Sequence, residues 1–119
     1  MIKLHFEGFK ALVLLKYHLA PEIIGKLIRY LPIDTYVYPS HNNLYMRLNI
    51  GSGGIQKISK LIVGDVFYDV TQDALGISLN VFKASFSQIK IGEIIEGLDS
   101  VKTIKKVLSV KIASIKNIE

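Results

Sequence analysis

The sequence predicts a mostly β fold: a closed barrel of eight antiparallel strands, capped by two α-helices. Most of the chain consists of short segments in which apolar and polar residues alternate, as in strands with one buried face. Only residues 21–31 and 98–106 change to the spacing of an amphipathic helix. A chain of 119 residues suits one domain, covering residues 1–119, and closure of the sheet removes exposed strand edges.

The chain begins with a predicted β-hairpin. Ile2, Leu4 and Phe6 alternate with polar residues, which indicates a half-buried first strand. Glu7–Gly8 is a turn signal, and residues 9–17 return as the second strand.

The first predicted helix follows this hairpin. Its apolar side chains share one helical face: Ile23, Ile24, Leu27, Ile28 and Leu31. Pro21 suits the first helical position, and Pro32 ends the helix at Leu31. Gly25 costs the helix about 1 kcal/mol relative to alanine, so we expect a close neighbour at that position.

Six further strands complete the predicted barrel, over residues 34–40, 44–50, 65–70, 75–82, 87–97 and 107–115. Two of them alternate clearly, and their expected inward residues are Leu44, Met46, Leu48, Ile50, Leu75, Ile77, Leu79 and Val81. The apolar phase shifts at Gly92, which predicts a β-bulge there. Residues 51–54 read as a flexible loop, and residues 55–63 fit a helix, a strand or an irregular segment equally well.

The second helix is expected over residues 98–106, directly after a turn at Gly97. Leu98, Val101 and Ile104 fall on one face of it. The remaining surface of this helix carries a cluster of lysines: Lys102, Lys105 and Lys106.

Composition excludes several classes of site. The chain has no cysteine, so disulfides, thiolate metal sites and a cysteine nucleophile are ruled out. His5, His18 and His41 have no metal-ligand spacing, and we expect neither a metal nor a cofactor. The net charge of +5 is spread over the chain, as on a solvated surface, so nucleic-acid binding is not expected.

The N-terminal residues lack the pattern of a signal peptide or a membrane span, which predicts a cytoplasmic protein with no membrane partner. The chain is rich in isoleucine and lysine and has no tryptophan, a composition like that of thermophile proteins. The sequence leaves the oligomeric state open.

Two segments resemble a known family. "GEIIEGLDSVKTIKKV", residues 92–107, resembles the C-terminal signature of cyclophilins. "VGDVFYDVTQDALGISLN", residues 63–80, is similar to the corresponding strands of the small prokaryotic cyclophilin-like domains. The resemblance implies a cyclophilin-like β-barrel. The arginine-to-QGGD run of cyclophilins and their asparagine-glycine-serine-glutamine-aromatic strand are absent, and "VFKASF" replaces a small-residue–Thr-Pro turn.

Arg47 is the candidate catalytic residue that this resemblance suggests. It is predicted on the outward face of its strand, between Tyr45 and Asn49. In cyclophilins an arginine on the outside of the barrel hydrogen-bonds the prolyl nitrogen of the twisted amide, and a glutamine assists. Arg47 and Gln56 are the residues here that resemble this pair. A surface arginine packed on a tyrosine, with an exposed loop glutamine, is the alternative interpretation.

An aromatic cluster is the candidate ligand site. Tyr36 and Tyr38 share a strand face, and Tyr45 is expected opposite them across a hairpin. With Phe67 and Gln56 they would form a surface for a peptide or a flat small molecule. Cross-strand packing explains the tyrosines equally well, and core packing explains Phe67.

The leading hypothesis is therefore a cyclophilin-like binding module for a peptide or small molecule on the outer barrel face. The first alternative is a peptidyl-prolyl cis-trans isomerase that uses Arg47. The second is a partner-binding subunit whose basic helix, residues 98–106, meets an acidic surface.

Overall fold

The structure is a computed structural model that describes residues 1–54 and 60–115. In chain order its elements are β1 (Ile2–Phe6), β2 (Phe9–Leu15), a 3-10 helix η1 (Tyr17–Leu19), α1 (Pro21–Tyr30), β3 (Ile33–Ser40), β4 (Asn43–Arg47), β5 (Lys60–Leu61), β6 (Asp65–Asp69), β7 (Ala74–Ser78), β8 (Phe82–Lys83), β9 (Gln88–Glu96), α2 (Leu98–Val101) and β10 (Leu108–Ser114). Within the described residues, no helix has the length and hydrophobicity needed to span a bilayer.

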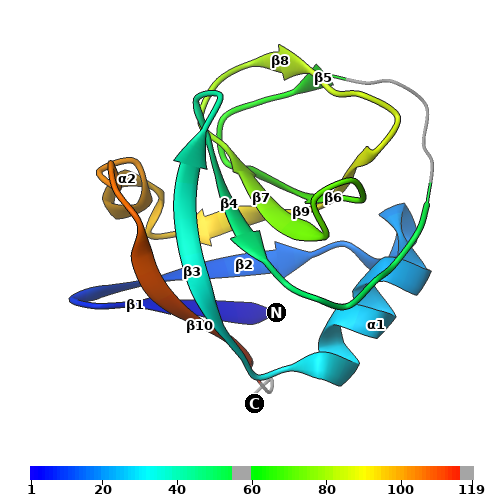
Figure 1. Ribbon diagram of the computed structural model, residues 1–119, viewed down its shortest axis with the longest axis horizontal. Helices are drawn as coiled ribbons and strands as arrows, with labels where there is room; N and C mark the ends of the chain where they lie inside the picture. The colour runs from blue at the N-terminus through cyan, green and yellow to red at the C-terminus, as the bar shows by residue number, and fades with distance from the viewer. Residues whose placement is uncertain (55–59, 116–119) are drawn as a thin grey trace.

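Eight of the strands close into one barrel in the order β1-β10-β3-β4-β7-β6-β9-β2, and every neighbouring pair is antiparallel. These are the eight strands expected from the alternating segments, so the predicted mostly β, closed antiparallel barrel with two helices is confirmed. The two short strands β5 and β8 form a separate sheet outside the barrel (Figure 1).

Alternate residues of the barrel strands fill its interior. Ile2, Leu4 and Val13 from the first hairpin and Ile112 from the last strand are fully buried. Side chains of both helical segments join the same core cluster: Ile23, Ile24 and Leu27 of α1, and Val101 and Ile104 at α2. The two helices therefore extend the barrel core, and Figure 1 shows them on opposite sides of the molecule.

The second helix is shorter than predicted. It covers only Leu98–Val101; residues 102–103 form a turn and residue 106 a bend before β10 begins at Leu108. The reason is a set of hydrogen bonds between residues three positions apart, as in a 3-10 helix. Thr103 donates both its N–H and its hydroxyl to Ser100 O, and Ile104 N donates to Val101 O. This tighter winding still buries Ile104, and it leaves all three lysines of the cluster exposed.

Leu48 and Ile50 are buried as expected, but the ends of two strands and the inward assignment of Val81 need correction. The strand expected over residues 44–50 ends at Arg47, because Asn49 has a positive φ of 59° and Leu48 N bonds Asp73 O instead of a strand partner. Val81 is exposed rather than inward, because β7 ends at Ser78, whose hydroxyl donates to Asn80 O in the turn that follows.

The expectation of a close neighbour at Gly25 is also wrong. A Cβ added to this helical glycine would meet no heavy atom within 4 Å. By contrast, the bulge expected near Gly92 is present: the β6–β9 register pairs Val66 with Gly92 but Phe67 with Lys90, which leaves one residue of β9 unpaired.

A buried tyrosine holds the loop that follows β4. Tyr68, which is 1% exposed, donates its hydroxyl proton to Asp73 Oδ1 at 2.6 Å and accepts from Ser52 N at 3.1 Å. The Asp73 carboxylate also accepts from the backbone N–H groups of Ile50 and Gly51. Residues 50–52 are thus fixed against the barrel by hydrogen bonds that start in its core.

This network makes stability depend on pH in alkali. Burial, and then the hydrogen bond to Asp73, raise the pKa of Tyr68 well above the ordinary tyrosine value of about 10. Above about pH 10 the Tyr68 side chain of the unfolded chain releases its proton while that of the folded chain keeps it, so the free energy of unfolding falls as pH rises. Between about pH 10 and 11 we expect wild type to lose about 1 kcal/mol more unfolding free energy than Tyr68→Phe. Urea denaturation at both pH values measures this, and equal losses in the two proteins would contradict it.

Candidate functional site

The predicted ligand-site residues among those described lie on the outer faces of β3, β4 and β6, with β7 between β4 and β6. Tyr38 of β3 pairs with Tyr45 of β4, as the sequence led us to expect. Tyr45 pairs with Gly76 of β7, and Gly76 pairs with Phe67 of β6. The Phe67 ring lies over this glycine, since a Cβ added at Gly76 would be 2.7 Å from Phe67 Cε1. The missing side chain makes room for the ring.

The rings form a continuous ladder across the outer face. Tyr38 and Tyr45 are stacked with centroids 5.9 Å apart. Phe67 meets Tyr45 edge to face at 5.8 Å and Phe82 of β8 at 6.0 Å. Such offset and edge contacts are the favourable geometries for aromatic pairs, so the ladder is a packed unit.

The sheet of β5 and β8 covers most of this ladder. Leu61 pairs with Phe82 in the small sheet, and both side chains pack onto the barrel. The resulting outer cluster consists of buried Tyr45, Leu61, Phe67, Ala74 and Ala84, with Tyr38 and Phe82 partly buried. Tyr45 is 3% exposed and Phe67 0%, so in this structure both face protein rather than solvent.

A polar chain borders the outer cluster. Tyr38 Oη donates to Gln72 Oε1 at 2.7 Å, and Gln72 donates from its backbone N and its Nε2 to the buried carboxylate of Asp69. Burial raises the pKa of the Tyr45 phenol, and the negative charge of Asp69 acts in the same direction. Tyr45 is therefore a neutral packing group at physiological pH.

Arg47 and Tyr36 form the exposed part of the site. The β3–β4 register pairs Val37 with Met46, and extending it by one residue places Tyr36 opposite Arg47 on the outer face. Tyr36 is 63% exposed and Arg47 is also exposed. Among residues 1–54 and 60–115, Arg47 has neither a hydrogen-bond partner nor an ion-pair partner. Its guanidinium is thus available beside an exposed aromatic ring.

A shallow hollow of about 600 Å³ adjoins Tyr36 on the far side from Arg47. It is lined by His5, Phe6, Glu7, Asp34, Thr35, Tyr36, Ser109, Val110 and Lys111. The registers place Lys111 of β10 between His5 of β1 and Asp34 of β3. Charges of both signs therefore line the hollow, which suits a ligand that itself carries both a carboxylate and an amine.

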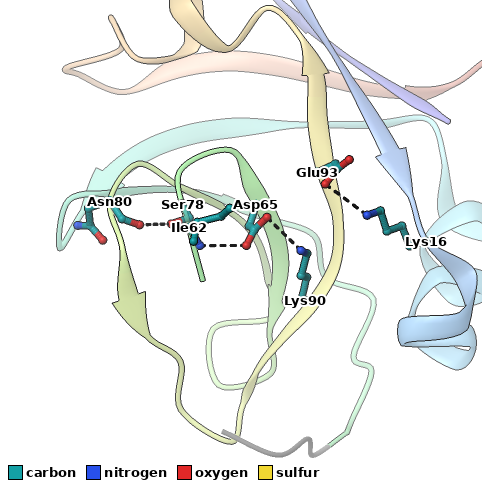
Figure 2. A network of polar contacts seen from close by, with 7 residues as sticks. All are labelled: Lys16, Ile62, Asp65, Ser78, Asn80, Lys90 and Glu93. Carbon is teal, nitrogen blue, oxygen red and sulfur yellow. Dashed lines mark hydrogen bonds and ion pairs between the residues drawn. The ribbon is translucent and has the colours of Figure 1, made fainter. Parts of the chain in front are cut away.

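The outer face of β9 carries a second group of charges, shown in Figure 2. Asp65 accepts from Lys90 Nζ at 3.2 Å and from Ile62 N at 3.0 Å, while Glu93 pairs with Lys16 at 3.3 Å. Each carboxylate already has its own cation, so we interpret these pairs as structural. No three or more His, Cys, Asp or Glu side chains in the described part of the chain are placed to hold a metal ion.

The remaining predicted residues lie elsewhere. Gln56 falls outside the described residues. The lysines of the basic segment, Lys102, Lys105 and Lys106, are exposed beyond α2. Sequence analysis missed His5, Asp34 and Lys111 as a group, although alternation placed His5 on the polar face of its strand. The missing information was strand order, because β1 and β10 come from opposite ends of the chain.

Comparisons with known proteins support the fold alone. No protein-family model and no curated protein sequence matches the chain. The solved structure of the hypothetical protein AF2241 from Archaeoglobus fulgidus is similar, with a TM-score of 0.77, 19% identity and coverage of 96% of this chain and 93% of that one. The structure of McbB in complex with tryptophan is similar with a TM-score of 0.68 and 15% identity. The structural match covers 98% of this chain but 47% of McbB, so this chain spans about half the length of that protein.

Proposed function

We propose that this protein is a binding module for a peptide or small molecule, with its ligand on the outer barrel face at Tyr36, Tyr38 and Arg47. The observation that supports this is the exposed Arg47 guanidinium, which has no polar partner among residues 1–54 and 60–115 and lies opposite the exposed Tyr36 ring. An arginine binds carboxylates or carbonyl oxygens through a rigid fork of N–H groups, and a tyrosine offers a flat apolar surface at low entropic cost.

The mixed charges of the adjoining hollow narrow the ligand class. A zwitterionic amino acid or a peptide terminus would place its carboxylate near Arg47 or Lys111 and its amine near Asp34. McbB is described in complex with tryptophan, a zwitterion with a flat side chain. In this proposal Tyr45 stacks beside Tyr38 and is itself contacted by Phe67, within the outer cluster.

The test is an NMR titration of the ¹⁵N-labelled protein with L-tryptophan and with tryptophanamide, which lacks the carboxylate. We expect saturable shifts confined to residues 34–38, 45–49 and 109–111. The amide and the Arg47→Ala variant should each bind about tenfold more weakly, because each removes one partner of a charged hydrogen bond.

Lys102→Ala, which removes an exposed cation elsewhere, is the matched control and should bind like wild type. If Arg47→Ala retains wild-type affinity for both probes, or the shifts spread over the whole surface, the proposed site is wrong. A panel of short peptides with free and blocked termini would extend the same titration.

Arg47 also leaves the isomerase alternative open to a direct test. Catalysis would need an apolar proline pocket beside the guanidinium, and the nearby apolar side chains of the outer cluster are covered by β5 and β8. We therefore expect an X-Pro peptide to exchange between cis and trans at its uncatalysed rate. Exchange spectroscopy measures this, and acceleration that disappears in Arg47→Ala would favour the isomerase.

The exposed lysines after α2 support the second alternative, an acidic partner. Such a complex should weaken with salt and with charge reversal at Lys102 and Lys105, whereas salt-independent capture would reject the electrostatic contact.

A further inference from the structure

A second hollow lies on a different part of the molecule, between α1 and the glycine-rich loop. Its volume is about 550 Å³. It is lined by Pro21, Glu22, Gly25, Lys26 and Arg29 of the helix and by Ser52, Gly53 and Gly54 of the loop. The sequence alone did not indicate an anion site here, because no helix clearly follows the glycines. The tertiary fold instead brings a helix from earlier in the chain against them.

The loop is held in one conformation. The hydrogen bonds of Tyr68 and Asp73 fix residues 50–52 from the barrel side, and Lys26 Nζ donates to Gly51 O at 3.1 Å from the helix side. Gly54 is pressed against the barrel, since an added Cβ would lie 2.9 Å from Ile89 Cδ1. A fixed loop keeps its backbone N–H groups in place before any ligand arrives.

Several residues that line this hollow carry donors with no partner in the described part of the chain. The exposed Arg29 guanidinium makes no hydrogen bond or ion pair with any described residue, and neither do the N–H groups of Gly53 and Gly54. Lys26 uses one N–H on Gly51 O and retains two. Cationic residues and glycines that line one space from two sides are an arrangement that proteins use for phosphate.

Gly25 is the second observation. It lies inside α1, where glycine is unfavourable, and no neighbour within 4 Å requires it. It also lines the hollow, one helical turn before Arg29. Packing within the protein does not explain this glycine. Close approach of a ligand to the helix backbone would explain it, because Gly25 lines the hollow.

We propose that this hollow binds the phosphate group of a small phosphorylated molecule. Arg29 and Lys26 supply the charge, and the N–H groups of Gly53 and Gly54 supply directional donors. A tetrahedral phosphate has more acceptor oxygens and more negative charge than a carboxylate, so it can use more of the donors on both sides of the hollow at once. Glu22 at the rim suits a hydroxyl or amine on the rest of the ligand.

The experiment uses inorganic phosphate as the probe, with acetate at the same ionic strength as the second arm. Titration of the ¹⁵N-labelled protein should give saturable shifts at Ser52, Gly53, Gly54 and the amides of α1 with phosphate, and at least fivefold weaker binding with acetate. Arg29→Gln should weaken phosphate binding about tenfold. Lys83→Gln removes one positive charge from an exposed position on β8, outside both hollows, and should leave phosphate binding unchanged.

Gly25→Ala separates a binding role from a structural one. The substitution should raise the melting temperature, because alanine favours the helix and the added methyl meets nothing within 4 Å. It should also weaken phosphate binding several-fold, because the methyl enters the hollow. Equal binding of phosphate and acetate would assign the hollow to carboxylates and overturn the proposal, as would shifts that do not saturate or unchanged affinity in Arg29→Gln.

Discussion

Replacing Gly92 with alanine is expected to lower the free energy of unfolding by about 3 kcal/mol. The new Cβ would clash with the carbonyl oxygen of Leu14 and would lie 3.1 Å from both Leu14 C and Leu15 Cα. All three atoms belong to the backbone of β2, so no side-chain rotation can relieve the contact. Relief requires β9 to move away from β2, which costs ladder hydrogen bonds next to the Leu15–Gly92 pair.

Urea denaturation measures this loss, and Gly25→Ala provides the matched control. Both variants add one methyl group to a glycine inside a regular element, but only Gly92 has backbone atoms at the position of the methyl. We therefore expect changes of opposite sign, with Gly25→Ala stabilising. A Gly92→Ala protein within about 0.5 kcal/mol of wild type would mean that the two strands are less tightly apposed than the structure shows.

Gly92 also illustrates how far the sequence carries the fold. The shift in apolar phase at this residue predicted a bulge, and alternation predicted all eight barrel strands, because both are properties of a single strand. The clash with Leu14 could not be predicted, because it depends on β2 being the neighbour of β9. The sequence of a single strand was sufficient to predict the strand and its bulge. It was not sufficient to predict which strands are neighbours, or the contacts between them.

The same limit applies to the candidate site. Alternation placed Tyr45 and Arg47 on the outer face, but it cannot tell whether an outer face meets solvent or further protein. The cover consists of two strands of only two residues each, too short to show a period in sequence. The length of α2 was missed for a local reason, since the hydroxyl bond of Thr103 to Ser100 O competes with continued α-helix.

Replacing Phe67 with alanine is the second large effect, with an expected loss of about 3 kcal/mol or more. The ring is 0% exposed and contacts both Tyr45 and Phe82, so it joins the barrel to the sheet of β5 and β8. Its removal leaves a space above Gly76, which has no side chain to fill it. We expect the amides of residues 60–61 and 82–84 to lose hydrogen-exchange protection more than those of the barrel interior, because the outer cluster is separate from the main core.

Guanidinium denaturation and hydrogen exchange measure the two parts of this result. Tyr36→Ala is the control: its ring is 63% exposed, and its loss should change stability by less than about 0.5 kcal/mol. The pair also separates packing from recognition on the outer face. If Tyr36→Ala weakens ligand binding without changing stability, while Phe67→Ala lowers stability, then Tyr36 contacts the ligand and Phe67 supports the surface. If instead Phe67→Ala changes neither stability nor exchange at β5 and β8, the ring does not hold the cover in place, and Tyr45 and Phe67 become accessible ligand contacts of the kind expected from the sequence.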